Sequence, residues 1–421
     1  MKTLQDVFES QTREQFSFDK IAARLVEKRL QALGITPTKA QLAELESTLR
    51  NVQSDAITLS IDESQLPRLD PKSEEAIKDG VSIDLGDSEQ ELDELVEEIT
   101  KVIPEVMRQV VEEMSELTLK RLKRGATSML KNRRSDSTSF EAHIARVWRK
   151  PLDLLEMFLE IALEAGSDFN EEFRPKASEE KDYVFEVLTR LHARACQIAS
   201  EVLVLLKSGH ADGAHARWRS LHEIAVVGFF IKSSGNEIAE RYLLHDAIES
   251  YKAAQLYKQY CEALGYEPYS AQELAEIEST YCDLISRFGP DYREEYGWAA
   301  PAIRKQRPTF RDIEQEAGLD RLRPFYKMAS HNVHANPKGI FFRLGLYPES
   351  QDTLLAGPSD TGLTDPGHGT AISLAQITLA LLTTVPNIDR LVICSILDKL
   401  QDEIGEAFLS VQKSLERDGV P

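Results

Sequence analysis

The stretch that decides the fold is EEKDYVFEVLTRLHARACQIASEVLVLLKSG, residues 179–209. Its apolar residues recur every three or four positions, which is the spacing of one face of an α-helix. Gly209 ends this helix, and Asp212 is placed to cap the next one, which runs through AHARWRSLHEIAVVGFFIKSS (214–234). The segment IAVVGFFI (224–231) is apolar on every side, so we expect it to be buried all round. Two such helices in succession predict the core of a helical bundle.

Helical patterns continue on both sides of this pair, so we predict an all-α fold with a multi-helix bundle domain over residues 136–416. One exception is expected near residues 340–356, where Ile340–Leu346 and Thr353–Leu355 are short enough and apolar enough to pair as a β-hairpin.

The amino-terminal third differs in composition and predicts a helical N-terminal extension. Helical spacing and a capping Thr36 or Thr38 predict a small helical hairpin at its start. Proline, glycine and acidic residues then replace any periodic pattern. We expect three segments before the bundle: a helical hairpin (1–60), an acidic linker (61–87) and amphipathic helices with a basic end (88–135).

Charge and hydropathy exclude some classes of partner. The chain of 421 residues carries a formal charge of -20, which disfavours broad adhesion to nucleic acid or to anionic lipid. No run of about 18 apolar residues occurs, so no membrane partner is expected. The expected location is the cytoplasm, and any contact with RNA or a nucleotide must be local.

The segment 88–135 carries an apolar stripe that predicts a protein partner. Its apolar residues from Leu92 to Leu117 recur at helical spacing, and its carboxyl end is rich in lysine and arginine. The basic end is either a solvated face near a helix end or a phosphate-binding patch. We expect a homo-oligomer, or another protein partner, to bind through residues 88–135.

Two charged residues near the buried helix are candidate catalytic residues. Arg219 and Glu223 are four positions apart, which places them on one helical face. Because they lie near a buried helical segment, the two charges must pair with each other or with a third polar group. A structural ion pair and a functional role are both compatible with this spacing.

A second candidate lies at YKMASHNVHANPKG, residues 326–339. A residue that precedes proline is disfavoured in helical geometry, so Pro337 ends the helix no later than Asn336. The carbonyl end of the helix dipole favours a charged imidazole at that end. His331 and His334 are therefore candidate catalytic residues, with His334 as a general acid or base or a phosphate contact. The alternative is that both histidines cap free carbonyls. Binding candidates in and around this segment are Lys327, Ser330, Asn332 and Lys338.

A metal site is not expected. His331 and His334 have a three-residue spacing that could bind one ion together with Glu223, but the chain lacks an H-E-x-x-H pattern. The predicted metal and cofactor content is therefore none.

Four stretches carry a resemblance to a known family: HADGAHARWRSLHEIAVVGFF, ERYLLHDAIESYK, YKMASHNVHANPKG and LAGPSDTGL. Together they resemble a bacterial family catalogued only as a domain of unknown function, over about residues 180–410. The resemblance implies a helical fold. It also implies that the Arg219–Glu223 pair and the Ser330–His334 helix end have counterparts in that family. It supplies no activity.

A more distant resemblance is to HEPN proteins, helical dimers that often act as metal-independent ribonucleases in toxin and phage-defence systems. HEPN proteins use an arginine and a histidine with four to six residues between them. Arg217 and His222, with four residues between them, match that spacing and are further binding candidates. The same pattern would place an arginine before His334, with four to six residues between them. Lys327, Met328 and Ala329 occupy those positions, so the arginine is missing there.

These observations lead to two hypotheses. The first is a cytoplasmic helical enzyme whose Arg/Glu/His pocket processes RNA or a nucleotide without a metal, in stress or phage defence. The second is a non-enzymatic scaffold that captures a protein partner through its amino-terminal helices. An enzyme requires Arg219, Glu223 and His334 to converge, whereas a scaffold does not.

Overall fold

A computed structural model describes residues 5, 9, 17–32, 35–50, 89–347 and 353–417. The chain divides into two compact units, Met1–Leu130 and Lys131–Pro421. Helix α5 (Glu89–Val147) begins in the first unit and ends in the second. The predicted linker, residues 61–87, lies outside the described residues, and the four-segment division of the chain stays a prediction.

In the first unit, helices α2 (Phe18–Ala32) and α3 (Lys39–Arg50) pack against each other. Their contact buries apolar side chains that include Leu25, Leu30 and Leu45. An ion pair of 3.1 Å between Arg50 and the buried Asp19 joins the two helices.

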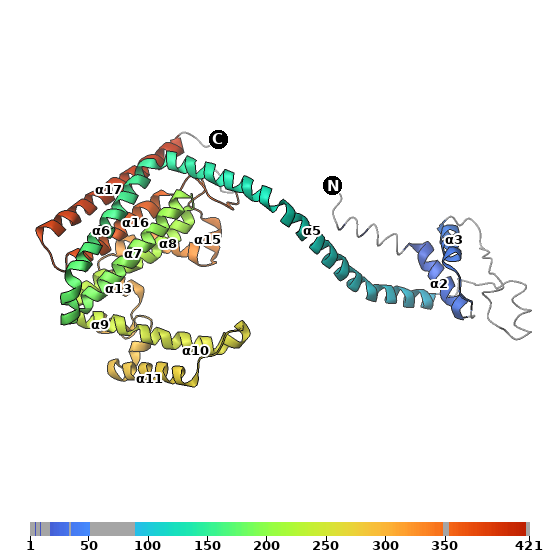
Figure 1. Cartoon of the computed structure of the whole chain (residues 1–421), viewed down its shortest axis with the longest axis horizontal. Coiled ribbons are helices and arrows are strands. Elements are labelled where there is room, and N and C mark those ends of the chain that lie inside the picture. The colour runs from blue at the N-terminus through green and yellow to red at the C-terminus, as the bar shows by residue number, and fades with distance from the viewer. Residues whose placement is uncertain are drawn as a thin grey trace, which may run out of the picture. The chain divides into compact units, whose positions relative to one another are not determined.

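The second unit is a helical bundle, in which five long helices lie side by side (Figure 1). They are α6 (Arg149–Glu180), α7 (Tyr183–Lys207), α8 (Ala211–Ser234), α16 (Thr364–Leu382) and α17 (Ile388–Arg417). Helix α16 contacts all four of the others and is buried around most of its circumference. Small residues allow this close packing: a Cβ atom on Gly369 of α16 would lie 2.9 Å from ring atoms of Trp218 on α8.

Shorter helices surround these five. The helices α10 and α11 form a hairpin (Figure 1). Helices α13 and α14 both pack against α8. The shorter elements are α9 (Asn236–Leu244), α10 (Asp246–Leu264), α11 (Ala271–Phe288), η2 (Pro290–Arg293), η3 (Gly297–Ala299), α12 (Ala300–Ile303), α13 (Phe310–Glu316), η4 (Asp320–Leu322), α14 (Arg323–Val333) and α15 (Pro337–Phe341).

The predicted β-hairpin near residues 340–356 is wrong. Residues 337–341 form helix α15, and neither 342–347 nor 353–356 contains a strand; residues 348–352 lie outside the described part. Local capping explains the helix, because the Asn336 side chain accepts a hydrogen bond from the Gly339 amide at 3.3 Å. The Leu344 amide donates to Asp212 of α8 at 3.0 Å rather than to a neighbouring strand. The all-α bundle itself is confirmed.

Candidate functional site

The two candidate residues on α8 lie together against α14. Arg219 forms a 3.0 Å ion pair with Glu223 and donates a hydrogen bond of 2.8 Å to the Tyr326 hydroxyl. That hydroxyl donates to Glu223 at 2.6 Å, and the arginine also lies over the tyrosine ring. Burial, followed by the Glu223 carboxylate, raises the pKa of Tyr326 to about 12. Arg219 and Glu223 therefore bind both each other and a third polar group, Tyr326, which no short-range pattern indicated.

The two candidate histidines do not join this cluster. The His331 ring is hydrogen-bonded to the Asn336 side chain at 2.7 Å. His334 follows the last residue of α14 and is exposed. Within the described residues, no hydrogen bond, ion pair or ring contact joins either histidine to Arg219 or Glu223. The predicted convergence of Arg, Glu and His is therefore absent from the described contacts.

Arg217 and His222 also have different partners. Arg217 pairs with Glu201 of α7, whereas His222 is fully buried and lies 3.0 Å from Glu314 of α13. Glu314 is itself fully buried and also pairs with Arg323. Burial alone would raise the pKa of Glu314, but hydrogen bonds from His222 and Arg323 hold it below its usual value. His222 is part of a buried polar network that holds α8, α13 and α14 together.

Inside the bundle, His222 continues an aromatic stack along α8. The ring centroids of His215 and Trp218 are 5.3 Å apart, and those of Trp218 and His222 are 5.6 Å apart. Neither ring nitrogen of His215 has a hydrogen-bond partner within the described structure, and burial lowers its pKa to about 4. This histidine is therefore neutral near pH 7 and serves the packing of the core.

The remaining binding candidates lie on the surface side of α14 and in the segment after it. Lys327 and Lys338 are exposed. The Ser330 hydroxyl donates to the Tyr326 carbonyl of its own helix at 2.9 Å. Asn332 instead donates from its side chain to Asp212 on α8 at 3.3 Å. Of these four residues, only Asn332 connects α14 to a second structural feature, a cleft at the start of α8.

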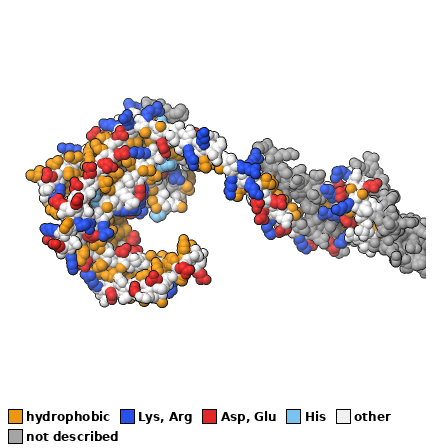
Figure 2. All heavy atoms as spheres, in the orientation of Figure 1, with side chains coloured by type: hydrophobic (Ala, Val, Ile, Leu, Met, Phe, Trp, Pro, Cys, Tyr) orange, Lys and Arg blue, Asp and Glu red, His pale blue; other side chains and the backbone are white. Residues whose placement is uncertain are grey.

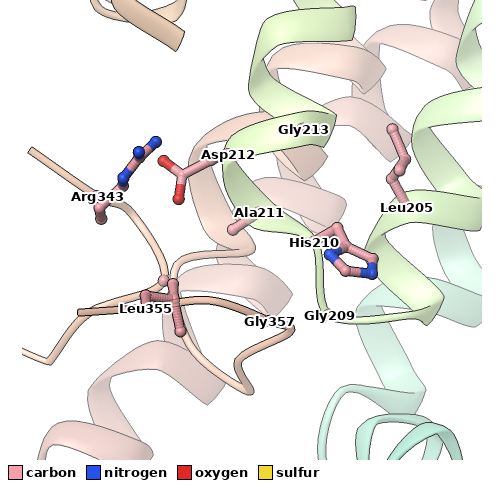
Figure 3. Close-up of a pocket in the computed structure, with 10 residues that line it drawn as sticks. Leu205, Gly209, His210, Ala211, Asp212, Gly213, Arg343, Leu355 and Gly357 are labelled. Carbon is pink, nitrogen blue, oxygen red and sulfur yellow. The ribbon is translucent and has the colours of Figure 1, made fainter. Parts of the chain in front are cut away.

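The cleft has a volume of about 420 Å³ and lies beside the first turn of α8 (Figure 3). It is lined by Leu205, Gly209, His210, Ala211, Asp212, Gly213, Arg343, Gly345, Leu355 and Gly357. The charged groups of Asp212 and Arg343 point toward one another across it (Figure 3). His210 precedes the first residue of α8 and its side chain is exposed, and α8 has no side-chain cap. Sequence reasoning missed this cleft, because only Asp212 was considered, and only as a helix cap.

Hydrogen bonds fix one side of Asp212 and leave the other available. Its Oδ1 atom accepts from the Asn332 side chain and from the Leu344 amide. Its Oδ2 atom and the Arg343 guanidinium have no hydrogen-bond or ion-pair partner within the described part of the chain. The cleft thus presents one fixed acceptor and one cation to a ligand.

Comparison with known proteins finds a match to one family model and gives no function. Residues 185–351 match a family of unknown function, DUF5677. This match begins inside α7 and continues through α15, so it includes α8, α14 and the cleft residue Arg343 but not Leu355 or Gly357. Neither the curated proteins nor the solved structures provide a match. The predicted resemblance to a family of unknown function is confirmed over residues 185–351 and not over the remainder of the predicted range, about 180–410. The HEPN resemblance has no support from these comparisons.

The described residues contain neither a metal-binding cluster nor a membrane-spanning helix. No group of three or more histidine, cysteine, aspartate or glutamate side chains is arranged to hold a metal ion. No helix in the described ranges has the length and apolar character that crossing a bilayer demands.

Proposed function

We propose that the bundle domain binds a nucleotide, or the end of an RNA strand, in the cleft beside the first turn of α8. The observation that carries this proposal is the presence in one cleft of Arg343, which has no ion-pair partner among the described residues, and the carboxylate of Asp212. Its volume of about 420 Å³ lies within the usual range for small-ligand sites.

The two charged groups favour a nucleotide over a simple anion. A guanidinium binds phosphate oxygens through paired hydrogen bonds. The free amide groups at the start of a helix also favour an anion. A carboxylate repels phosphate but accepts hydrogen bonds from ribose hydroxyls or a base amine. A nucleotide would bind Arg343 through its phosphate and Asp212 Oδ2 through a hydroxyl or amine. Inorganic phosphate would bind only Arg343.

We also propose a chemical role for this site, which is metal-independent processing of the bound RNA or nucleotide. His210 lines the same cleft as Arg343, so it takes the acid–base role that the sequence suggested for His334. Arg343 would stabilise negative charge that develops on phosphate. The HEPN resemblance favours RNA as substrate, a cytoplasmic location and a role in stress or phage defence.

Removing the Arg343 cation is expected to weaken nucleotide binding. The Arg343→Ala variant should bind AMP, or a 5′-phosphorylated single-stranded RNA, about 10- to 100-fold more weakly, because hydrogen bonds to charged groups contribute about 1.5–3 kcal/mol. Isothermal titration calorimetry measures this change. Lys338→Ala is the matched control, since Lys338 is exposed and does not line the cleft. Equal binding by both variants and the unmodified protein would exclude the cleft as the nucleotide-binding site.

Cleavage is tested separately from binding. Purified protein with total RNA and a chelator is expected to give fragments on a gel. His210→Ala should slow their formation by about 10²- to 10⁴-fold, the usual contribution of a general acid or base. His334→Ala should cleave normally. Loss of activity in His334→Ala alone would move the site to the end of α14, and nucleotide binding without any cleavage would leave a binding module and exclude the enzyme.

A further inference from the structure

A separate feature of the first unit is an apolar stripe along α5 that the described residues leave uncovered. Val96, Val106, Met107, Val110 and Leu117 are between 38% and 65% exposed, and Ile103 and Met114 are half-buried. At 100° per residue, all seven lie on one side of the helix. A long helix with an open apolar face is marginal alone in water and is stabilised by packing of that face.

The stripe has the symmetry of a self-complementary surface. Around a midpoint between Val106 and Met107, Ile103 and Val110 are equally distant, and so are Val96 and Leu117. Six of the seven positions thus form three pairs that are the same in both directions along the helix, and only Met114 has no counterpart among them. An antiparallel twofold pair requires this property, because each apolar position then faces the mirrored position of the reversed copy, whereas a parallel twofold pair does not require it. Pro104 lies near this midpoint without ending the helix, so the face is continuous.

Charge determines which direction the second copy runs. Residues 89–98 contain six acidic and no basic residues, whereas residues 115–124 contain four basic residues and one acidic residue. The two kinds of side chain gather on separate stretches of α5 (Figure 2). In a parallel pair the two acidic stretches would lie side by side and repel each other. In an antiparallel pair each acidic stretch lies beside the basic stretch of the other copy.

We infer that α5 is a dimerisation helix, which pairs with α5 of a second copy of this chain in an antiparallel arrangement centred near Val106 and Met107. Val96 of one copy lies near Leu117 of the other. The contact covers about 22 residues of each helix, or roughly 32 Å at 1.5 Å per residue. That length is about three heptads, the lower limit for a stable helical pair, so the charged flanks contribute to its specificity.

Site-directed cross-linking distinguishes this arrangement from its alternatives. The exposed Cys282 is first replaced by serine, since the other three cysteines are buried. Two full-length chains of different tag size, one with Val96→Cys and one with Leu117→Cys, are mixed and treated with a short bismaleimide. We expect a cross-linked species that contains one chain of each size. Within one chain the two positions are about 32 Å apart along the helix, so they cannot react with each other.

Each other outcome overturns part or all of the inference. Cross-linking of the Val96→Cys chain to itself, without the mixed species, would show a parallel pair. A monomer by light scattering at the same concentration would mean that a different partner, or another part of this chain, covers the stripe. Val110→Glu is expected to convert the dimer to a monomer, whereas Glu112→Gln, a substitution away from the stripe, should leave it dimeric. Circular dichroism of both variants verifies that their helix content is unchanged.

Discussion

Replacing Glu314 by alanine is expected to lower the free energy of unfolding of the bundle by about 3–5 kcal/mol. Glu314 is fully buried and is the shared partner of His222 and Arg323. Its removal leaves a positive charge from Arg323 without a carboxylate and leaves the buried His222 ring without a hydrogen-bond acceptor. The cost therefore comes from the groups that remain more than from the contact that is lost. Chemical denaturation measures the change.

Helix α13 supplies a control for this substitution. Glu316 lies on the same helix, two residues further along, and is exposed. Glu316→Ala should change the free energy of unfolding by no more than about 0.5 kcal/mol, as is usual for surface substitutions. If Glu314→Ala were equally mild, the buried network would not be what holds α13 and α14 against α8.

The long helices were predictable because their evidence is local. Helical spacing in residues 183–207 and the fully apolar segment 224–231 each lie within one helix, and both segments are helical as predicted. In the second segment Ile224, Val227 and Phe229 are only partly buried, so it is not buried all round as expected. The hairpin was mispredicted for the same reason. A short apolar segment does not by itself distinguish a helix from a strand. Here Asn336 caps a helix, and Asp212, which is remote in sequence, accepts a hydrogen bond from the Leu344 amide.

The site was predictable only where its residues share a helix. Arg219 and Glu223 are one turn apart, so their pairing follows from spacing alone. Their third partner, Tyr326, is more than one hundred residues away, and so is Arg343 from Asp212. No spacing rule connects such positions, because they are brought together by the packing of α8 against α14 and the segment after it. The roles of His331 and His334 stay predictions, because a polar helix end gives no information about which distant residues lie beside it.

The bundle is expected to lose stability steeply on mild acidification because two neutral histidines are buried in it. Burial lowers the pKa of His192 and of His215 to about 4 from the ordinary value of 6.5. The His192 ring lies 3.1 Å from the Thr378 hydroxyl. That hydroxyl donates to the Leu374 carbonyl, so it accepts from the neutral ring of His192.

The sign of the effect follows from proton binding. A histidine with a lower pKa in the folded state takes up its proton only on unfolding, so its contribution is complete above pH 6.5 and is lost as the pH falls toward 4. Each histidine contributes up to about 1.4 kcal/mol per pH unit in that range. For the two together, we expect a loss of about 4 kcal/mol between pH 7 and pH 5, measured by denaturant titration at each pH.

Substitution separates these histidines from other sources of acid sensitivity. His215→Phe keeps an aromatic ring beside Trp218 but cannot be protonated, so about half of the loss between pH 7 and pH 5 should disappear. His334→Phe is the control, because His334 is exposed on the folded chain. An unaltered slope in His215→Phe would mean that this ring is already able to take up a proton in the folded bundle. A slope reduced equally by both substitutions would place the acid sensitivity at the surface instead of in the core.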